Sequence, residues 1–83
     1  MWKEENNELV REFIFKDFVQ AFAFMTNVAK EIDEMDHHPE WSNVYNKVNI
    51  SLCTHEAGDT VTEKDYALAN KIDQIYLSLQ DKE

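Results

Sequence analysis

Two adjacent histidines, His37 and His38, stand in the stretch DHHPEW at residues 36–41, directly before the only proline of the chain. The third histidine, His55, follows in the stretch CTHE at residues 53–56. Imidazole is the side chain whose ordinary pKa lies nearest to neutral pH, so two such groups can donate one proton and accept another. These residues leave three roles open: a metal site, an acid/base site or a charged helix terminus.

The spacing of the two adjacent histidines argues against a metal site. Histidines that chelate from a helix are spaced by three or four residues, whereas adjacent rings on a helix diverge by about 100°. The chain has one cysteine, Cys53, and no HExxH motif. Cys53 and His55 share a strand face, but no orienting third group or oxyanion loop is evident, so we predict a packed cysteine and not a nucleophile. The sequence therefore predicts no metal site.

An acid/base site and a charged helix terminus remain equally compatible with the spacing. Asp33 lies one helical turn before His37, where its carboxylate can orient the imidazole and favour the charged form. Histidines in the last turn of a helix are also favourable toward the helix dipole. Thr62 and Asp65 are spaced as a helix capping box.

Alternating apolar residues predict the strands that must carry these groups. LVREFIF at residues 9–15 predicts a strand, and the preceding WKEENNE predicts a short partner with Asn6-Asn7 as the turn. SNVY at residues 42–45 predicts a third strand, with Asn46-Lys47 near the reversal. In the following strand, Val48, Ile50 and Leu52 face one way and Asn49, Ser51, Cys53 and His55 face the other.

Helical spacing predicts two amphipathic helices. The first begins at an N-cap, Asp17, and is stopped by Pro39, and its expected apolar stripe is Phe18, Phe22, Met25, Ala29 and Ile32. The second follows Gly58 and the capping box, with the expected stripe Leu68, Ile72, Ile75 and Leu79. The predicted fold is α+β: a four-stranded antiparallel sheet with two long helices packed on one face, in the order β-β-α-β-β-α.

Length and charge limit the classes of function. The 83 residues predict a single domain, 1–83, whose small core favours self-association. With 17 acidic and 8 basic residues the formal net charge is −9, so we expect no direct nucleic-acid partner and no membrane partner. The unpaired cysteine fits a reducing compartment. No signal peptide and no apolar span is recognised, and we predict a cytoplasmic protein.

Taken together, DEMDHHPEW, NVYNKV and SLCTHEAGDTVTEKD closely resemble the pterin-4a-carbinolamine dehydratase family. The family pattern is an acidic residue, three spacers, His-His-Pro, an aromatic residue, a histidine and an aspartate. It is matched by Asp33, His37-His38-Pro39, Tyr45, His55 and Asp65. FKDFVQAFAFM resembles the first long helix of the family, so the resemblance covers nearly the whole chain.

The resemblance implies dehydration of 4a-hydroxytetrahydropterin to quinonoid dihydropterin, which recycles the pterin cofactor of aromatic amino-acid hydroxylases. It implies no metal and no cofactor. The departing 4a-hydroxyl needs an acid and the N5 proton needs a base, roles that the resemblance gives to His37 and His55, while His38 holds or orients the substrate. The substrate would lie against Asp36, His37, His38, Cys53, Thr54, His55 and Glu56, and Asp33 and Glu56 would orient or tune the imidazoles.

The resemblance also implies a homodimer or homotetramer. Some members act as dimerisation cofactors of a homeodomain transcription factor, so a coactivator-type binding module is an alternative, as is a non-catalytic pterin-binding role in molybdopterin metabolism. Members usually carry a further helical segment before the strand that begins near Trp2, and we expect the sheet and the site to form without it. Asp33 and Cys53 stand where Glu and Ser are familiar in the family.

Overall fold

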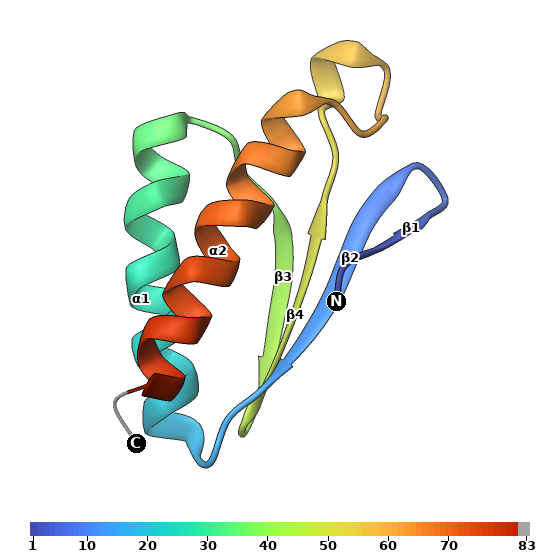
Figure 1. The fold of residues 1–83 in the computed structure, drawn as a ribbon. Helices are drawn as coiled ribbons and strands as arrows, with labels where there is room; N and C mark the ends of the chain where they lie inside the picture. Colours follow the sequence, from blue (N-terminus) through green and yellow to red (C-terminus); the bar gives the residue numbers. More distant parts are fainter. Residues whose placement is uncertain (82–83) are drawn as a thin grey trace.

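Four strands form one antiparallel sheet, and two long helices lie on one of its faces (Figure 1). The structure, a computed structural model, describes residues 1–81. In chain order its elements are β1 (Lys3–Glu5), β2 (Glu8–Ile14), α1 (Phe18–Met35), β3 (Glu40–Val44), β4 (Lys47–Leu52), the 3-10 turn η1 (His55–Ala57) and α2 (Glu63–Asp81). The predicted α+β fold is confirmed. Residues 82–83 of the predicted domain lie outside the described residues.

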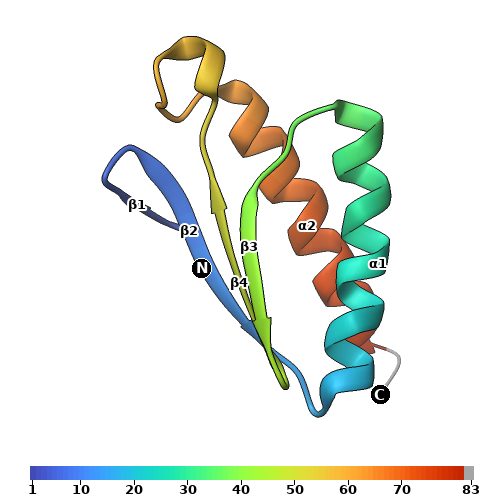
Figure 2. The same cartoon turned by 180° about the vertical axis from the view of Figure 1, so that it is seen from behind.

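The strand order is β1-β2-β4-β3, so β2 and β4 form the middle of the sheet. Their register places Leu9 opposite Leu52 and Phe13 opposite Val48. Residues that face each other in an antiparallel pair project to the same side, which puts all four side chains against the helices. Figure 2 shows the same arrangement from behind, with both helices to the right of the sheet and β3 at the sheet edge nearer to them.

Both hairpins reverse through residues with positive φ. Asn6 (φ 51°) and Asn7 (φ 65°) form the β1–β2 turn, as predicted from the tolerance of asparagine for this region. The second reversal comes one residue earlier than predicted, at Tyr45-Asn46, because Tyr45 adopts a φ of 53° and Lys47 already belongs to β4. Tyr45 is therefore a turn residue and not the end of a strand.

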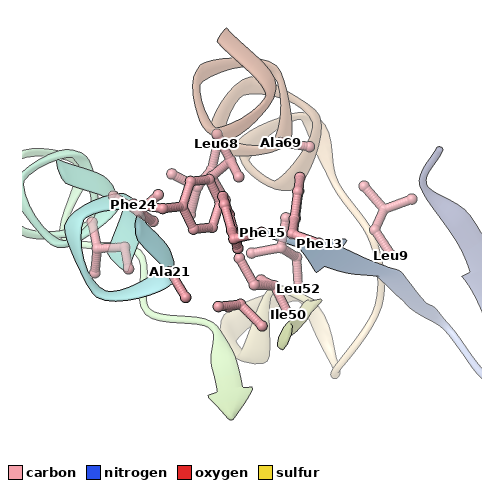
Figure 3. Close-up of a cluster of buried hydrophobic side chains, with 13 residues drawn as sticks. Leu9, Phe13, Phe15, Ala21, Phe24, Ile50, Leu52, Leu68 and Ala69 are labelled. Atoms are coloured by element: carbon pink, nitrogen blue, oxygen red, sulfur yellow. The ribbon is translucent and has the colours of Figure 1, made fainter. Parts of the chain in front are cut away.

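The core lies between the sheet and the helices (Figure 3). Val48, Ile50 and Leu52 are at most 1% exposed, which confirms the predicted alternation of β4. Aromatic rings fill part of this core: the ring centroid of Phe24 lies 4.9 Å from those of both Phe13 and Phe15. Such contacts add to the free energy gained by burying the rings.

The predicted apolar stripe of α1 is wrong by part of a turn. The buried residues are Ala21, Phe24, Val28 and Ile32, of which only Ile32 belongs to the predicted stripe. Met25 of the predicted stripe is partly buried against the core. Phe18 and Phe22 are 46% and 54% exposed and contact each other at 5.7 Å. Both sets of residues obey helical spacing, and packing of Phe24 on the sheet decides which face is buried. The helix begins as predicted, with Asp17 accepting a hydrogen bond from the Gln20 N–H (2.9 Å).

Helix α2 carries the predicted stripe. Leu68 and Ile72 are fully buried, and Ile75 and Leu79 are partly buried against the same core. Before it, Gly58 (φ 88°) ends η1 in the left-handed region, where glycine has no steric penalty. Among the described residues, neither helix has the length and apolar character that crossing a membrane requires.

Candidate active site

The two adjacent histidines lie just beyond α1 and not within it. The helix ends at Met35, before Pro39 is reached, because Asp36 adopts the left-handed conformation (φ 52°, ψ 42°). The Asp36 N–H then points back to the carbonyls of Ile32 and Asp33, and the His37 N–H donates to the Ile32 carbonyl (3.3 Å). This is the geometry of a helix C-cap, which is usually formed by glycine or asparagine. The chain turns here, so the two imidazoles need not follow helical spacing.

His37 turns into the protein and meets a buried carboxylate. Its side chain is 8% exposed, and its Nε2 lies 2.6 Å from Oδ1 of Asp65, which has no exposed surface. The other carboxylate oxygen, Oδ2, accepts hydrogen bonds from the Thr54 hydroxyl (2.8 Å) and from the Thr62 N–H (2.9 Å). The last bond is half of the predicted capping box of α2. Asp65 thus links the start of α2 to both halves of the site.

The structure brings Asp65, and not Asp33, to His37. Asp33 is exposed on α1, and its carbonyl accepts the Asp36 N–H at 3.3 Å. The expectation that Asp33 would orient the ring assumed that His37 continues the helix, which the left-handed Asp36 prevents. From the sequence, Asp65 was predicted to cap a helix, and it also matches the aspartate of the family pattern. The hydrogen bond to His37 depends on tertiary contact between segments 28 residues apart, which spacing does not reveal.

The other two histidines share an open cavity of about 320 Å³. Its lining includes residues of the β1–β2 turn, the α1–β3 connection and the η1 loop, three segments that lie at the same end of the sheet (Figure 2). Its lining residues are Asn6, Glu8, His38, Glu40, Ser51, Cys53, His55 and Asp59. His38 and His55 are both well exposed, at 66% and 74% of their side chains. Two accessible imidazoles therefore face one hollow that a small ring compound can enter.

A carboxylate lies beside each of the two exposed imidazoles. His55 Nδ1 lies 2.5 Å from Oδ1 of Asp59, and this hydrogen bond is the main reason that the pKa of His55 is raised from its ordinary value. His38 Nε2 lies 3.4 Å from Oδ1 of Asp36. A raised pKa keeps a larger share of His55 protonated near neutral pH, as a general acid requires.

Cys53 lies on the cavity wall as a protonated thiol. Burial, followed by the charges of Glu8 and Asp59, raises its pKa. A thiol with a raised pKa is a poor nucleophile at neutral pH, in keeping with the sequence-based interpretation of Cys53 as a packed residue.

The predicted site residues thus separate into three groups. His38, Cys53 and His55 line the cavity. His37 and Thr54 are buried beside it and share Asp65 as a hydrogen-bond partner. Asp33, Asp36 and Glu56 are exposed, and Glu56 lines a separate hollow at the start of α2.

Sequence reasoning missed Asp59 and the residues of the β1–β2 hairpin. Asp59 is four residues from His55, but no helix spans that interval; the turn at Gly58 brings the two together. Asn6 and Glu8 reach the cavity because β2 pairs with β4. A signal for Asp59 is present in the dipeptide Gly58-Asp59, which is typical of a tight reversal.

The fold and the cavity define an α+β protein with a pocket at the end of a four-stranded sheet, lined by His38 and His55. Residues 1–75 match the profile of the family described as Pterin 4 alpha carbinolamine dehydratase. The chain belongs to this family, which is named for a hydro-lyase activity. The family resemblance of the sequence motifs is therefore confirmed.

Relatives in three bacteria carry the provisional name pterin-4-alpha-carbinolamine dehydratase. The protein of Solibacter usitatus is 50% identical over 74 residues, covering 89% of this chain and 77% of its own length. That of Rhodospirillum rubrum is 55% identical over 67 residues, covering 81% of this chain and 69% of its own. That of Paraburkholderia xenovorans is 62% identical over 65 residues, covering 78% and 67%.

Two solved structures share the fold. A transcriptional coactivator/pterin dehydratase from Brucella melitensis has a TM-score of 0.86 and 42% identity, covering 90% of this chain and 81% of that one. A pterin dehydratase-like protein identified as a RuBisCO assembly factor in the alpha-carboxysome has a TM-score of 0.78 and 27% identity, covering 90% and 88%. Names in this group therefore include both dehydratase and assembly roles.

Proposed function

We propose that this chain dehydrates 4a-hydroxytetrahydropterin to quinonoid dihydropterin by histidine acid/base catalysis, and so recycles the pterin cofactor of aromatic amino-acid hydroxylases. The observation that carries the proposal is the placement of His38 and His55 on one open cavity. The reaction removes water without any change of oxidation state, so it requires only an acid and a base. The names of the relatives support this choice of substrate.

His55 is the proposed acid. It donates its proton to the 4a-hydroxyl, the C4a–O bond breaks and water leaves, while the electron pair of the N5–H bond forms the new C=N bond. The hydrogen bond to Asp59, which raises the pKa of His55, keeps the ring protonated for this step. His55 is then a neutral imidazole and regains a proton from solvent.

His38 is the proposed base that accepts the N5 proton. The resemblance gave this second role to His37, but His37 Nε2 is held by the buried Asp65, whereas His38 lines the same cavity as His55. We propose that the His37–Asp65 pair positions the segment that carries His38. Asp36, Cys53, Thr54 and Glu56 remain proposed parts of the substrate site.

The test is the absorbance change that follows dehydration of the pterin carbinolamine, with and without the purified protein. We expect the wild-type chain to accelerate the reaction well above its spontaneous rate, in a buffer that contains a metal chelator. A rate equal to the spontaneous rate would show that the chain does not catalyse this dehydration.

A binding role is the second candidate, because α1 exposes Phe18, Val19 and Phe22 as neighbouring apolar side chains. Exposed apolar groups of this size on one helix are typical of a contact surface. We propose that this surface supports a homodimer or homotetramer, or a protein partner of the kind implied by the coactivator and assembly names of the two similar structures. A partner that still binds a variant lacking all three histidines would show a function separate from catalysis. The cytoplasm remains our proposed location.

A further inference from the structure

The loop after β4 brings a thiol, an imidazole and a carboxylate together. Thr54 pairs with Thr60 across the loop, with the Thr54 N–H donating to the Thr60 carbonyl at 2.9 Å, and the Asp59 N–H donates to the Thr54 carbonyl at 3.1 Å. These bonds fold residues 55–59 back onto the strand end. As a result, one potential ligand atom from each of Cys53, His55 and Asp59 lies within 4.8 Å of the others.

We propose that Cys53, His55 and Asp59 bind a divalent cation that favours sulfur and nitrogen ligands, with Zn²⁺ as the representative ion, on the wall of the pterin cavity. A thiolate, an imidazole and a carboxylate are all ligands of Zn²⁺ in proteins. Hard cations such as Mg²⁺ and Ca²⁺ prefer oxygen alone and are disfavoured by this set. Neither His37 nor His38, the adjacent residues whose spacing argued against a metal site, belongs to this group of three ligands.

Metal binding requires the hydrogen bond between His55 and Asp59 to open and the Cys53 sulfur to come closer to both side chains. Ligand atoms that lie about 2.0–2.3 Å from a tetrahedral zinc ion are roughly 3.5 Å from one another. The candidate ligand atoms of Cys53, His55 and Asp59 are separated by up to 4.8 Å, so the widest separation must shrink by about 1 Å. The side chains of His55 and Asp59 are 74% and 72% exposed, so they can rotate without repacking the core. Three protein ligands leave the fourth position open toward the cavity.

The surroundings attract a cation. Glu8 and Glu40 line the same cavity as the three ligands. Together with Asp59 they contribute to the raised pKa of Cys53, whose largest cause is burial. Coordination replaces the thiol proton, which passes to solvent as the sulfur–metal bond forms. The site has three protein ligands, two of them on exposed side chains, so we expect reversible binding that is weaker than in the closed four-ligand sites of structural zinc proteins.

Occupation of this site would take His55 out of proton transfer and narrow the space for the pterin. This consequence rests on the proposed function, whereas the binding of the ion does not. Zinc and a pterin are therefore expected to compete, and the dehydratase would be inhibited reversibly by Zn²⁺.

Binding is measured first, without pterin, by isothermal titration calorimetry of the full chain with Zn²⁺. We expect one ion per chain and a loss of affinity of at least about tenfold in Cys53→Ser, since even the loss of a group that only supports a metal ligand costs that much. Asp59→Asn should also weaken binding, and it provides a second variant at an exposed position. Asp36→Asn, the same change at the exposed carboxylate beside His38, should leave the affinity unchanged.

Co²⁺ supplies the spectroscopic test of the sulfur ligand. The wild-type chain should show a thiolate-to-cobalt charge-transfer band that is absent in Cys53→Ser. The site is overturned if this band is missing, if Cys53→Ser binds Zn²⁺ as the wild type does, or if Asp36→Asn is the variant that loses binding. If Zn²⁺ binds as predicted but leaves pterin binding and dehydration unchanged, the competition is overturned. A chain without dehydratase activity that still binds Zn²⁺ through Cys53 would refute the proposed function alone.

Discussion

Nε2 of His37 lies 2.6 Å from Oδ1 of Asp65, and the two residues connect the end of α1 to the first turn of α2. Asp65 has no exposed surface, and its second oxygen accepts two further hydrogen bonds, from Thr54 and Thr62. The start of α2, the end of β4 and the histidine segment are thus fixed by one carboxylate.

Replacing Asp65 should therefore destabilise the protein and impair the site together. Asp65→Asn loses the charge opposite His37 and leaves a mismatched donor in the network, at an expected cost of about 1–3 kcal/mol in the free energy of unfolding. Asp33→Asn, the same change at the exposed carboxylate, should cost less than about 0.5 kcal/mol. Urea unfolding of both variants measures the difference. Equal losses would show that Asp65 has no special role.

The burial of Phe24 and the exposure of Phe22 give a test of how α1 faces the sheet. Phe24→Ala removes a fully buried ring and should cost about 3–5 kcal/mol in the free energy of unfolding. Phe22→Ala changes a side chain that is 54% exposed and should cost far less at low protein concentration. The opposite order of the two losses would mean that the stripe predicted from the sequence is the buried one.

The exposed rings of α1 also predict self-association. Phe18→Glu together with Phe22→Glu places charge on the exposed apolar surface of α1, and we expect this double variant to dissociate the homo-oligomer without loss of helix content. Light scattering after size-exclusion chromatography measures the mass, and far-ultraviolet circular dichroism checks the fold. A wild-type chain that stays monomeric at high concentration, or an oligomer that survives both changes, would contradict this use of the surface.

The hydrogen bond to Asp59 predicts a particular pH dependence. Because the pKa of His55 is raised above its ordinary 6.5, the pair favours the folded state below that pH, and this contribution is lost as the pH rises through the folded-state pKa. If protonated His55 is the acid, activity should fall on the alkaline side as His55 loses its proton. Asp59→Asn removes the main cause of the shift and should move this alkaline limb to lower pH.

NMR titration of the His55 ring in both proteins measures the pKa directly. An alkaline limb that stays in place while the pKa of His55 falls would assign the limb to another group.

Much of the fold follows from local sequence. The alternation of β4, the Asn6-Asn7 turn, the Asp17 cap and the stripe of α2 each depend on neighbours along the chain, and the structure confirms each of them. The face of α1 could not be fixed in this way, because two apolar stripes satisfy the same period. Packing of Phe24 between Phe13 and Phe15 decides between them, and that contact requires the sheet.

The site was predicted only in part, for the same reason. The residue types and the family pattern identified the histidines, but not which of them share a cavity. Aspartate adopts the left-handed conformation more often than most residues but much less often than glycine, so the residue type alone did not predict that Asp36 turns His37 inward. The link from His37 to Asp65 and the place of Asp59 beside His55 both arise from segments that meet only in the folded chain.

The central claim is that His38 and His55 together carry out the dehydration, and single-histidine variants in the carbinolamine assay test it most directly. Removal of a positioned acid or base typically costs about 10²–10⁴-fold in rate, so His55→Gln and His38→Gln should each lose activity on this scale while the fold is retained. His37→Gln should lower stability as well as activity, because it breaks the bond to Asp65. Catalysis by these two histidines is contradicted if His38→Gln and His55→Gln dehydrate the carbinolamine as fast as the wild type does.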